Sequence, residues 1–99
     1  MRLSAAEVDT IRRAAGRHFG EDCVVRLFGS RVDDRRRGGD IDLHIVAARD
    51  DLVTLDAEIA FALDVRERLG DQKVDVIVRR PHEPPRPIDA VALETGVRL

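Results

Sequence analysis

One segment, residues 40–45 with the sequence DIDLHI, constrains the fold of this chain more than any other. Apolar and polar residues alternate through it with a period of two, which is the pattern of a β-strand with one face in the core. The two isoleucines and the leucine then face the interior, while Asp40, Asp42 and His44 share the opposite face. The segment therefore predicts a sheet with one apolar and one polar side.

Two helices are predicted around this strand. Ser4 and Glu7 form a capping box that begins the first, and Asp50 or Asp51 is placed to cap the second, which Gly70 stops. We expect the second helix to bury the apolar positions that recur along it, namely Leu52, Leu55, Ile59, Ala62, Leu63 and Leu69. The alternative is a homo-oligomer in which this stripe contacts a second copy, because so small a domain has a modest core.

Further strands and a short helix complete the order. Residues 24–28 and 74–78 are short runs rich in β-branched residues, Pro87 opens a helix through Leu93, and residues 97–99 can pair as an edge strand. The order α-β-β-α-β-α-(β) predicts an α/β (α+β) fold, a small mixed sheet of three to four strands with helices packed on it. The strands joined by the second helix are expected to be parallel, or separated by another strand.

Length and composition exclude several classes of protein. The 99 residues, 43% of them hydrophobic, predict a single domain spanning residues 1–99. A net charge of -2 argues against direct nucleic-acid binding, and no stretch approaches the ~20 apolar residues of a membrane span. Cys23 is the only cysteine, so no intrachain disulfide can form and a reducing cytoplasm is the expected location.

The carboxylates of the polar face suggest a metal site. Asp40 and Asp42, two positions apart on one strand, project from the same face roughly 7 Å apart along the chain and repel each other. A divalent cation relieves this repulsion, and Mg²⁺ prefers a few carboxylate oxygens together with water and phosphate oxygens. Asp75, in the middle of another apolar strand, is a further charge that needs compensation, which a second metal ion could provide.

A glycine turn precedes the polar strand. Gly29 follows the strand at residues 24–28, and a glycine there lets backbone N–H groups approach an anion. The hydroxyl of Ser30 can donate to a phosphate oxygen, and Arg31 is placed to contact phosphate. These residues are nucleotide-binding candidates. His44 is either a further contact to metal or substrate or an ordinary residue of the strand.

Together, Gly29-Ser30-Arg31, Asp40-Ile41-Asp42-Leu43 and Asp75 resemble the signature of the DNA polymerase β-like nucleotidyltransferase superfamily, in particular its minimal nucleotidyltransferases. The resemblance covers nearly the whole chain and implies a nucleotidyltransferase fold. It implies that Asp40 and Asp42 hold two Mg²⁺ ions, and that Asp75 ligates the catalytic ion and helps to deprotonate the acceptor. Gly29 and Ser30 would bind the triphosphate.

The resemblance also implies an activity and a partner. Minimal nucleotidyltransferases are usually antitoxins of HEPN/MNT toxin–antitoxin modules, in which they transfer AMP from ATP to a hydroxyl, commonly of tyrosine, on a small helical HEPN-type ribonuclease. Two alternatives stay open. The chain could be a non-catalytic nucleotide- or metal-binding module that neutralises a partner protein by contact, or a metal-binding α/β domain without nucleotide chemistry.

Overall fold

The computed structural model describes residues 3–29, 40–70 and 72–99. Four strands form one sheet in the order β3-β2-β1-β4, with β1 at Val24–Phe28, β2 at Ile41–Val46, β3 at Val74–Arg79 and β4 at Val97–Arg98. β1 pairs antiparallel with β2 and with β4, and β2 pairs parallel with β3. The predicted mixed sheet is confirmed, and the two strands joined by the second helix are parallel neighbours.

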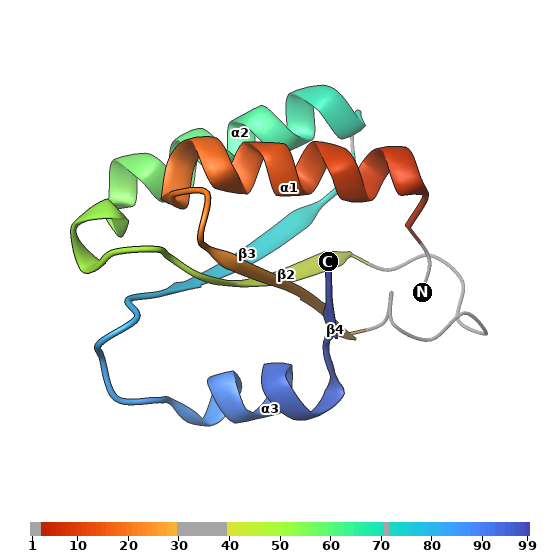
Figure 1. Ribbon diagram of the computed structural model, residues 1–99. Helices are drawn as coiled ribbons and strands as arrows, with labels where there is room; N and C mark the ends of the chain where they lie inside the picture. The colour runs from red at the N-terminus through yellow and green to blue at the C-terminus, as the bar shows by residue number, and fades with distance from the viewer. Residues whose placement is uncertain (1–2, 30–39, 71) are drawn as a thin grey trace.

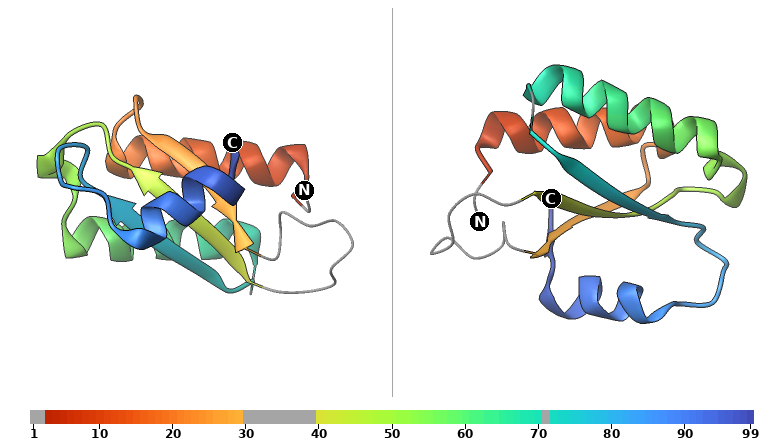
Figure 2. Two further views of the ribbon diagram at one scale, coloured as in Figure 1. Left: turned by 90° about the horizontal axis from the view of Figure 1, so that it is seen from below. Right: turned by 180° about the vertical axis from the view of Figure 1, so that it is seen from behind.

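Helices cover the two faces of the sheet unequally. α1 (Ala5–Phe19) and α2 (Leu55–Leu69) lie side by side on one face, and the shorter α3 (Pro87–Thr95) lies on the other (Figure 1 and Figure 2). Within the described ranges, no helix is long and apolar enough to cross a membrane. The arrangement leaves part of the second face, where β2 begins, outside the cover of a helix.

α1 begins and packs as its sequence predicts. The Ser4 hydroxyl accepts a hydrogen bond from the Glu7 N–H at 3.1 Å, and the Glu7 carboxylate accepts one from the Ser4 N–H at 2.9 Å. This reciprocal bonding satisfies two backbone donors that the first turn leaves without helical partners. Ile11, Ala15 and Phe19 are fully buried on the face that meets the sheet.

α2 differs from the prediction in its start and in its buried face. The helix begins after Thr54, whose hydroxyl accepts from the Ala57 N–H, whereas residues 50–52 form a separate 3-10 turn. Phe61 and Val65 are the fully buried residues of α2. Of the predicted stripe, Leu52, Ala62 and Leu69 are partly buried, and Leu69 packs against the core. The prediction is wrong for its three middle large residues, which are among the most exposed apolar side chains: Leu55 at 70%, Ile59 at 50% and Leu63 at 61%.

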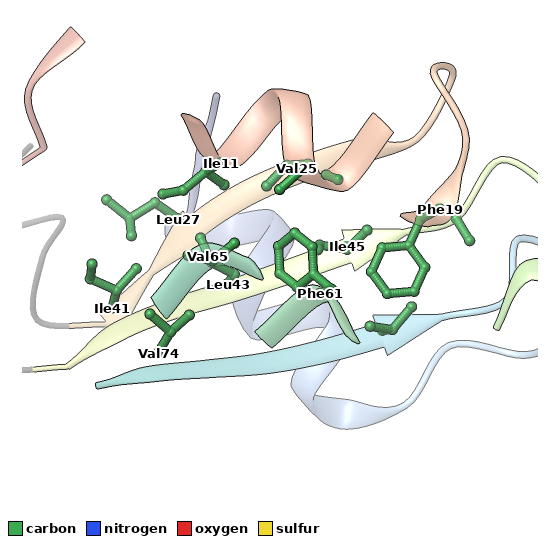
Figure 3. Close-up of a cluster of buried hydrophobic side chains, with 14 of the residues drawn as sticks. Ile11, Phe19, Val25, Leu27, Ile41, Leu43, Ile45, Phe61, Val65 and Val74 are labelled. Atoms are coloured by element: carbon green, nitrogen blue, oxygen red, sulfur yellow. The ribbon is translucent and has the colours of Figure 1, made fainter. Parts of the chain in front are cut away.

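The physical reason lies in the size of the competing side chains. Phe61 and Val65 follow the same helical spacing as the stripe, so periodicity alone does not choose between the two faces. The aromatic ring buries more apolar area, and it packs against Phe19 of α1 with ring centroids 5.4 Å apart. Figure 3 shows both rings above the sheet among the apolar side chains of β1, β2 and β3.

The C-terminal elements follow the sequence closely. α3 starts with Pro87 in its first turn and extends to Thr95, two residues beyond the predicted end. Its first turn also holds Asp89, and Asp89 and Ala92 are the residues that it buries against the sheet. The Gly96 N–H donates to the carbonyl of Ala92, and the predicted edge strand is present as β4.

Candidate functional site

Two of the predicted site residues lie side by side on the polar face of the sheet. Asp42 on β2 and Asp75 on β3 are directly paired in the parallel register. Asp40 directly precedes β2, and alternation along the strand directs it to the same face. The register, which the crossover through α2 establishes, therefore brings together carboxylates that are more than thirty positions apart in the sequence.

The electrostatics of this cluster centre on Asp42. Burial raises the pKa of the Asp42 carboxyl, the negative charges of Asp75 and Asp40 raise it further, and the positive charge of Lys73 opposes them in part. Lys73 Nζ lies 3.5 Å from Asp40 Oδ2, but both side chains are well exposed, so this ion pair contributes little. The cluster therefore holds more negative charge than its own cation balances.

Gly29 lies directly against this cluster. Its φ of +77° is a conformation that residues with a side chain rarely adopt. A Cβ atom at this position would collide with Oδ2 of Asp42 and lie 3.1 Å from its Cγ. Because glycine has no side chain, the backbone can turn at the end of β1 while the Asp42 carboxylate lies directly against it.

The donor set fits Mg²⁺ in chemistry without forming a complete cage. Among the residues that the structure describes, no three His, Cys, Asp or Glu side chains group closely enough to hold a metal ion. Mg²⁺ in phosphoryl-transfer sites is usually held by one or two carboxylates, the other ligands being water and substrate phosphates. Asp42 with either neighbouring aspartate satisfies that requirement, and their mutual repulsion favours an added cation.

The exposure of Asp75 differs from the sequence prediction. We expected a buried charge in need of compensation, but the side chain of Asp75 is exposed. The reason is that β3 is an edge strand whose polar face carries no helix at this position. The expected cost of burial is therefore absent, and the case for Asp75 rests on its pairing with Asp42.

His44 shares the polar face but is covered by α3. It is 2% exposed, and its Nε2–H donates to Oδ1 of Asp89 at 2.7 Å. The suggested contact of His44 with metal or substrate is replaced by this buried bond. Ser30 and Arg31, predicted to bind nucleotide, lie outside the described residues.

Asp89 is the centre of a polar network that attaches α3 to the sheet. Burial alone would raise its pKa, but the Arg86 backbone N–H, His44 and the Arg86 guanidinium together lower the pKa of Asp89 to about 2. The Nε atoms of Arg79 and Arg86 each lie 3.5 Å from Asp89 Oδ2. The charged carboxylate therefore joins the first turn of α3 to both β2 and β3.

Sequence reasoning missed Lys73 and Asp89. Lys73 precedes Asp75 by two residues, so strand alternation would have placed it on the face of the carboxylates. Asp89 lies 45 residues from His44, and no local pattern joins them. Its position three residues after the helix cap, where a carboxylate can bond back to the backbone, was the one available signal.

Comparisons with known proteins support the fold. No protein-family model matches the chain, and no curated protein matches it. A chain in the crystal structure of a mutant of the toxin–antitoxin MntA–HpeT is similar, with a TM-score of 0.71 and 17% sequence identity over 97% of this chain and 71% of that chain. MntA is a minimal nucleotidyltransferase. The chain thus has a nucleotidyltransferase fold, as its sequence predicts.

Proposed function

We propose that the chain is a Mg²⁺-dependent nucleotidyltransferase that transfers a nucleoside monophosphate, AMP from ATP, to a hydroxyl of a partner protein. The observation that supports it best is the carboxylate cluster of Asp40, Asp42 and Asp75 on a nucleotidyltransferase fold. The structural similarity to a toxin–antitoxin complex further supports a HEPN-type toxin as the partner, with this chain as the antitoxin.

In the proposed reaction an oxygen of the acceptor attacks the α-phosphorus of the nucleotide. The new O–P bond forms as the bond between the α-phosphorus and the bridging oxygen breaks, and pyrophosphate leaves. Asp75, which is exposed on the edge strand β3, would accept the proton of the acceptor hydroxyl. Asp42, with Asp40 or Asp75, would hold Mg²⁺, which when bound stabilises negative charge on the phosphate oxygens.

The backbone next to the carboxylates would bind and position the triphosphate. Gly29 brings the backbone at the end of β1 next to Asp42, where the triphosphate would lie. Ser30 and Arg31, which follow Gly29 in the sequence, are proposed to contact the phosphates. These contacts would position the α-phosphorus for attack, and positioning is the main contribution of a protein to phosphoryl transfer.

The test uses the chain together with the protein encoded next to its gene. The purified pair is incubated with ATP and Mg²⁺, and the intact mass of each protein is recorded. Asp42→Asn should abolish the added mass of AMP on the partner, because it removes the central carboxylate. Asp22→Asn removes an equal charge from an exposed turn and is the matched control.

A second function has one specific observation in its favour. The similar chain comes from a structure of a toxin–antitoxin pair, which also supports a non-catalytic module that neutralises its partner by contact and keeps the aspartates for nucleotide or metal binding. Unchanged masses, no release of pyrophosphate and a stable complex would support this function over catalysis. A complex that forms equally well with Asp42→Asn would strengthen that conclusion.

A further inference from the structure

Phe28 is the one phenylalanine of the chain that lies outside the apolar core. The chain has three aromatic residues, all of them phenylalanines, and neither tyrosine nor tryptophan. Phe19 and Phe61 are fully buried and pack against each other. Phe28 is only half-buried, and it is not part of the apolar cluster that α1 and α2 form with the sheet. Its ring therefore belongs to the second face of the sheet.

The strand register places this ring beside the carboxylate cluster. Phe28 of β1 is directly paired with Asp42 of β2. The side chains of such a pair lie on the same face, with Cβ atoms about 4.5–5.5 Å apart. Leu27, which precedes Phe28, is fully buried on the core face, as the alternation along a strand requires. Phe28 thus borders Asp42 on the side away from β3 and Asp75.

The cover provided by α3 ends between this pair and the next. His44, two residues after Asp42 on the same face, is 2% exposed and is bonded to Asp89 of α3. Asp42 and Phe28 are each only half-buried. They lie where β2 begins, in the part of this face outside the cover of the described helices (Figure 1). The ring is therefore accessible to a ligand that binds at the carboxylates.

We infer that Phe28 stacks against the base of the bound nucleotide. This inference rests on the proposed function, because it takes the triphosphate to lie next to Asp42. Phosphate groups are charged and gain little from an aromatic ring, whereas a nucleobase has a flat face on which such a ring stacks. One sugar joins the base to the α-phosphate, so a ring beside the carboxylates is close enough to meet the base.

The side of the cluster on which Phe28 lies favours the nucleotide over the acceptor. In an in-line displacement the attacking and the leaving oxygen lie on opposite sides of the phosphorus. Gly29, which directly follows Phe28, is next to Asp42, where the triphosphate would lie. Asp75, which would accept the proton of the acceptor, lies across β2 from Phe28. The acceptor therefore approaches over β3, and the nucleotide occupies the side of β1.

Stacking on Phe28 also predicts the class of nucleotide. An aromatic ring contacts the face of every base, so it adds affinity without reading the hydrogen-bonding groups of the base. A purine offers a larger face than a pyrimidine and buries more apolar area against the ring. Phe28 should therefore favour ATP and GTP over CTP and UTP, without separating ATP from GTP.

The first experiment measures the binding of two ligands to the full chain by titration calorimetry, each with Mg²⁺. The ligands are ATP and inorganic triphosphate, which lacks the nucleoside. Phe28→Leu keeps an apolar side chain and removes the ring, and it should weaken ATP binding about 5-fold or more without changing triphosphate binding. Unchanged triphosphate binding also shows that the variant has folded. Phe28→Tyr keeps the ring and should bind ATP as the wild type does.

Ile77→Ala is the matched control. Ile77 is also half-buried and shares the face of Asp75, two residues before it, but it lies on β3, two strands away from Phe28. Its replacement should leave the ratio of the two affinities unchanged. The second experiment repeats the titrations with GTP, CTP and UTP. The preference for purines over pyrimidines should shrink in Phe28→Leu and persist in Ile77→Ala.

Two results would overturn the inference. One is a Phe28→Leu variant that binds ATP as tightly as the wild type; if its KM for the partner protein is raised, the ring contacts the acceptor instead. The other is an equal loss of ATP and triphosphate binding, since Phe28 would then support the phosphate site rather than the base.

These results are distinct from failure of the proposed function. A wild-type chain that binds ATP and transfers no AMP would refute the proposed function and leave the contact between Phe28 and the base intact. A wild-type chain that binds neither ATP nor triphosphate would refute both.

Discussion

Removing the charge of Asp89 should weaken the attachment of α3 by a predictable amount. The carboxyl is 1% exposed, and its pKa falls from an ordinary value of 3.8 to about 2 in the folded protein. A difference of 3.8 − 2 = 1.8 pH units corresponds to about 2 kcal/mol of stability, at 1.36 kcal/mol for each pH unit. Asp89→Asn should therefore reduce the free energy of unfolding at pH 7 by about 2 kcal/mol.

The sign of the pH dependence follows from the lowered pKa. A carboxyl with a lowered folded pKa stabilises the protein above its unfolded pKa and loses that contribution as the pH falls through the folded pKa. The stability difference between the wild-type chain and Asp89→Asn should thus be full above pH ~5 and shrink between pH ~4 and pH ~2. Urea unfolding followed by circular dichroism at a series of pH values measures it.

A matched variant separates this effect from a general loss of charge. Glu94 lies on the same helix with an exposed side chain, and Glu94→Gln should change the stability by less than about 0.5 kcal/mol at any pH. A difference between wild type and Asp89→Asn that stays constant from pH 7 to pH 2 would refute the reasoning, because the carboxylate charge would then contribute nothing.

Four further outcomes are expected. Phe61→Ala should cost about 3–5 kcal/mol in urea unfolding, because the fully buried ring leaves a cavity beside Phe19. Gly29→Ala should lower the melting temperature and the rate of AMP transfer together, since φ is +77° and the new methyl group collides with Asp42; an unchanged rate would contradict this. Asp42→Asn should raise the melting temperature in the absence of metal by relieving repulsion, and millimolar Mg²⁺ should stabilise the wild type but not this variant. Ser4→Ala should lower the free energy of unfolding by about 1 kcal/mol, because it removes the cap of α1. Asn can also cap a helix, so an equal loss in Ser4→Asn would show that capping is not the cause.

Local signals predicted most of the fold. The capping box at Ser4, the alternation in residues 40–45 and Pro87 each act through neighbouring residues, so the sequence alone locates α1, β2 and α3. The buried face of α2 could not be chosen this way. Two apolar stripes share its helical period, and the ring of Phe61 decides between them only by packing against another helix.

The candidate site was predicted in part. Alternation placed Asp42 on the polar face, and the parallel register, which the sequence left open, brings Asp75 next to it. The bond between His44 and Asp89 depends on α3 crossing back over the sheet, so no spacing along the chain predicts it. The assignments of Ser30 and Arg31 to phosphate, and of the aspartates to Mg²⁺, remain predictions.

The unequal cover of the sheet has a consequence for local opening of the native protein. α1 and α2 hold their face through a shared apolar core, whereas α3 is attached mainly through Asp89, Ala92 and the turn at Gly96. Amide hydrogens of α3 should therefore exchange with solvent through a sub-global opening of lower free energy than global unfolding. As the pH falls from ~4 to ~2 and Asp89 loses its charge, this opening would uncover the polar face of β2, while the amides of α1 and β1 stay protected.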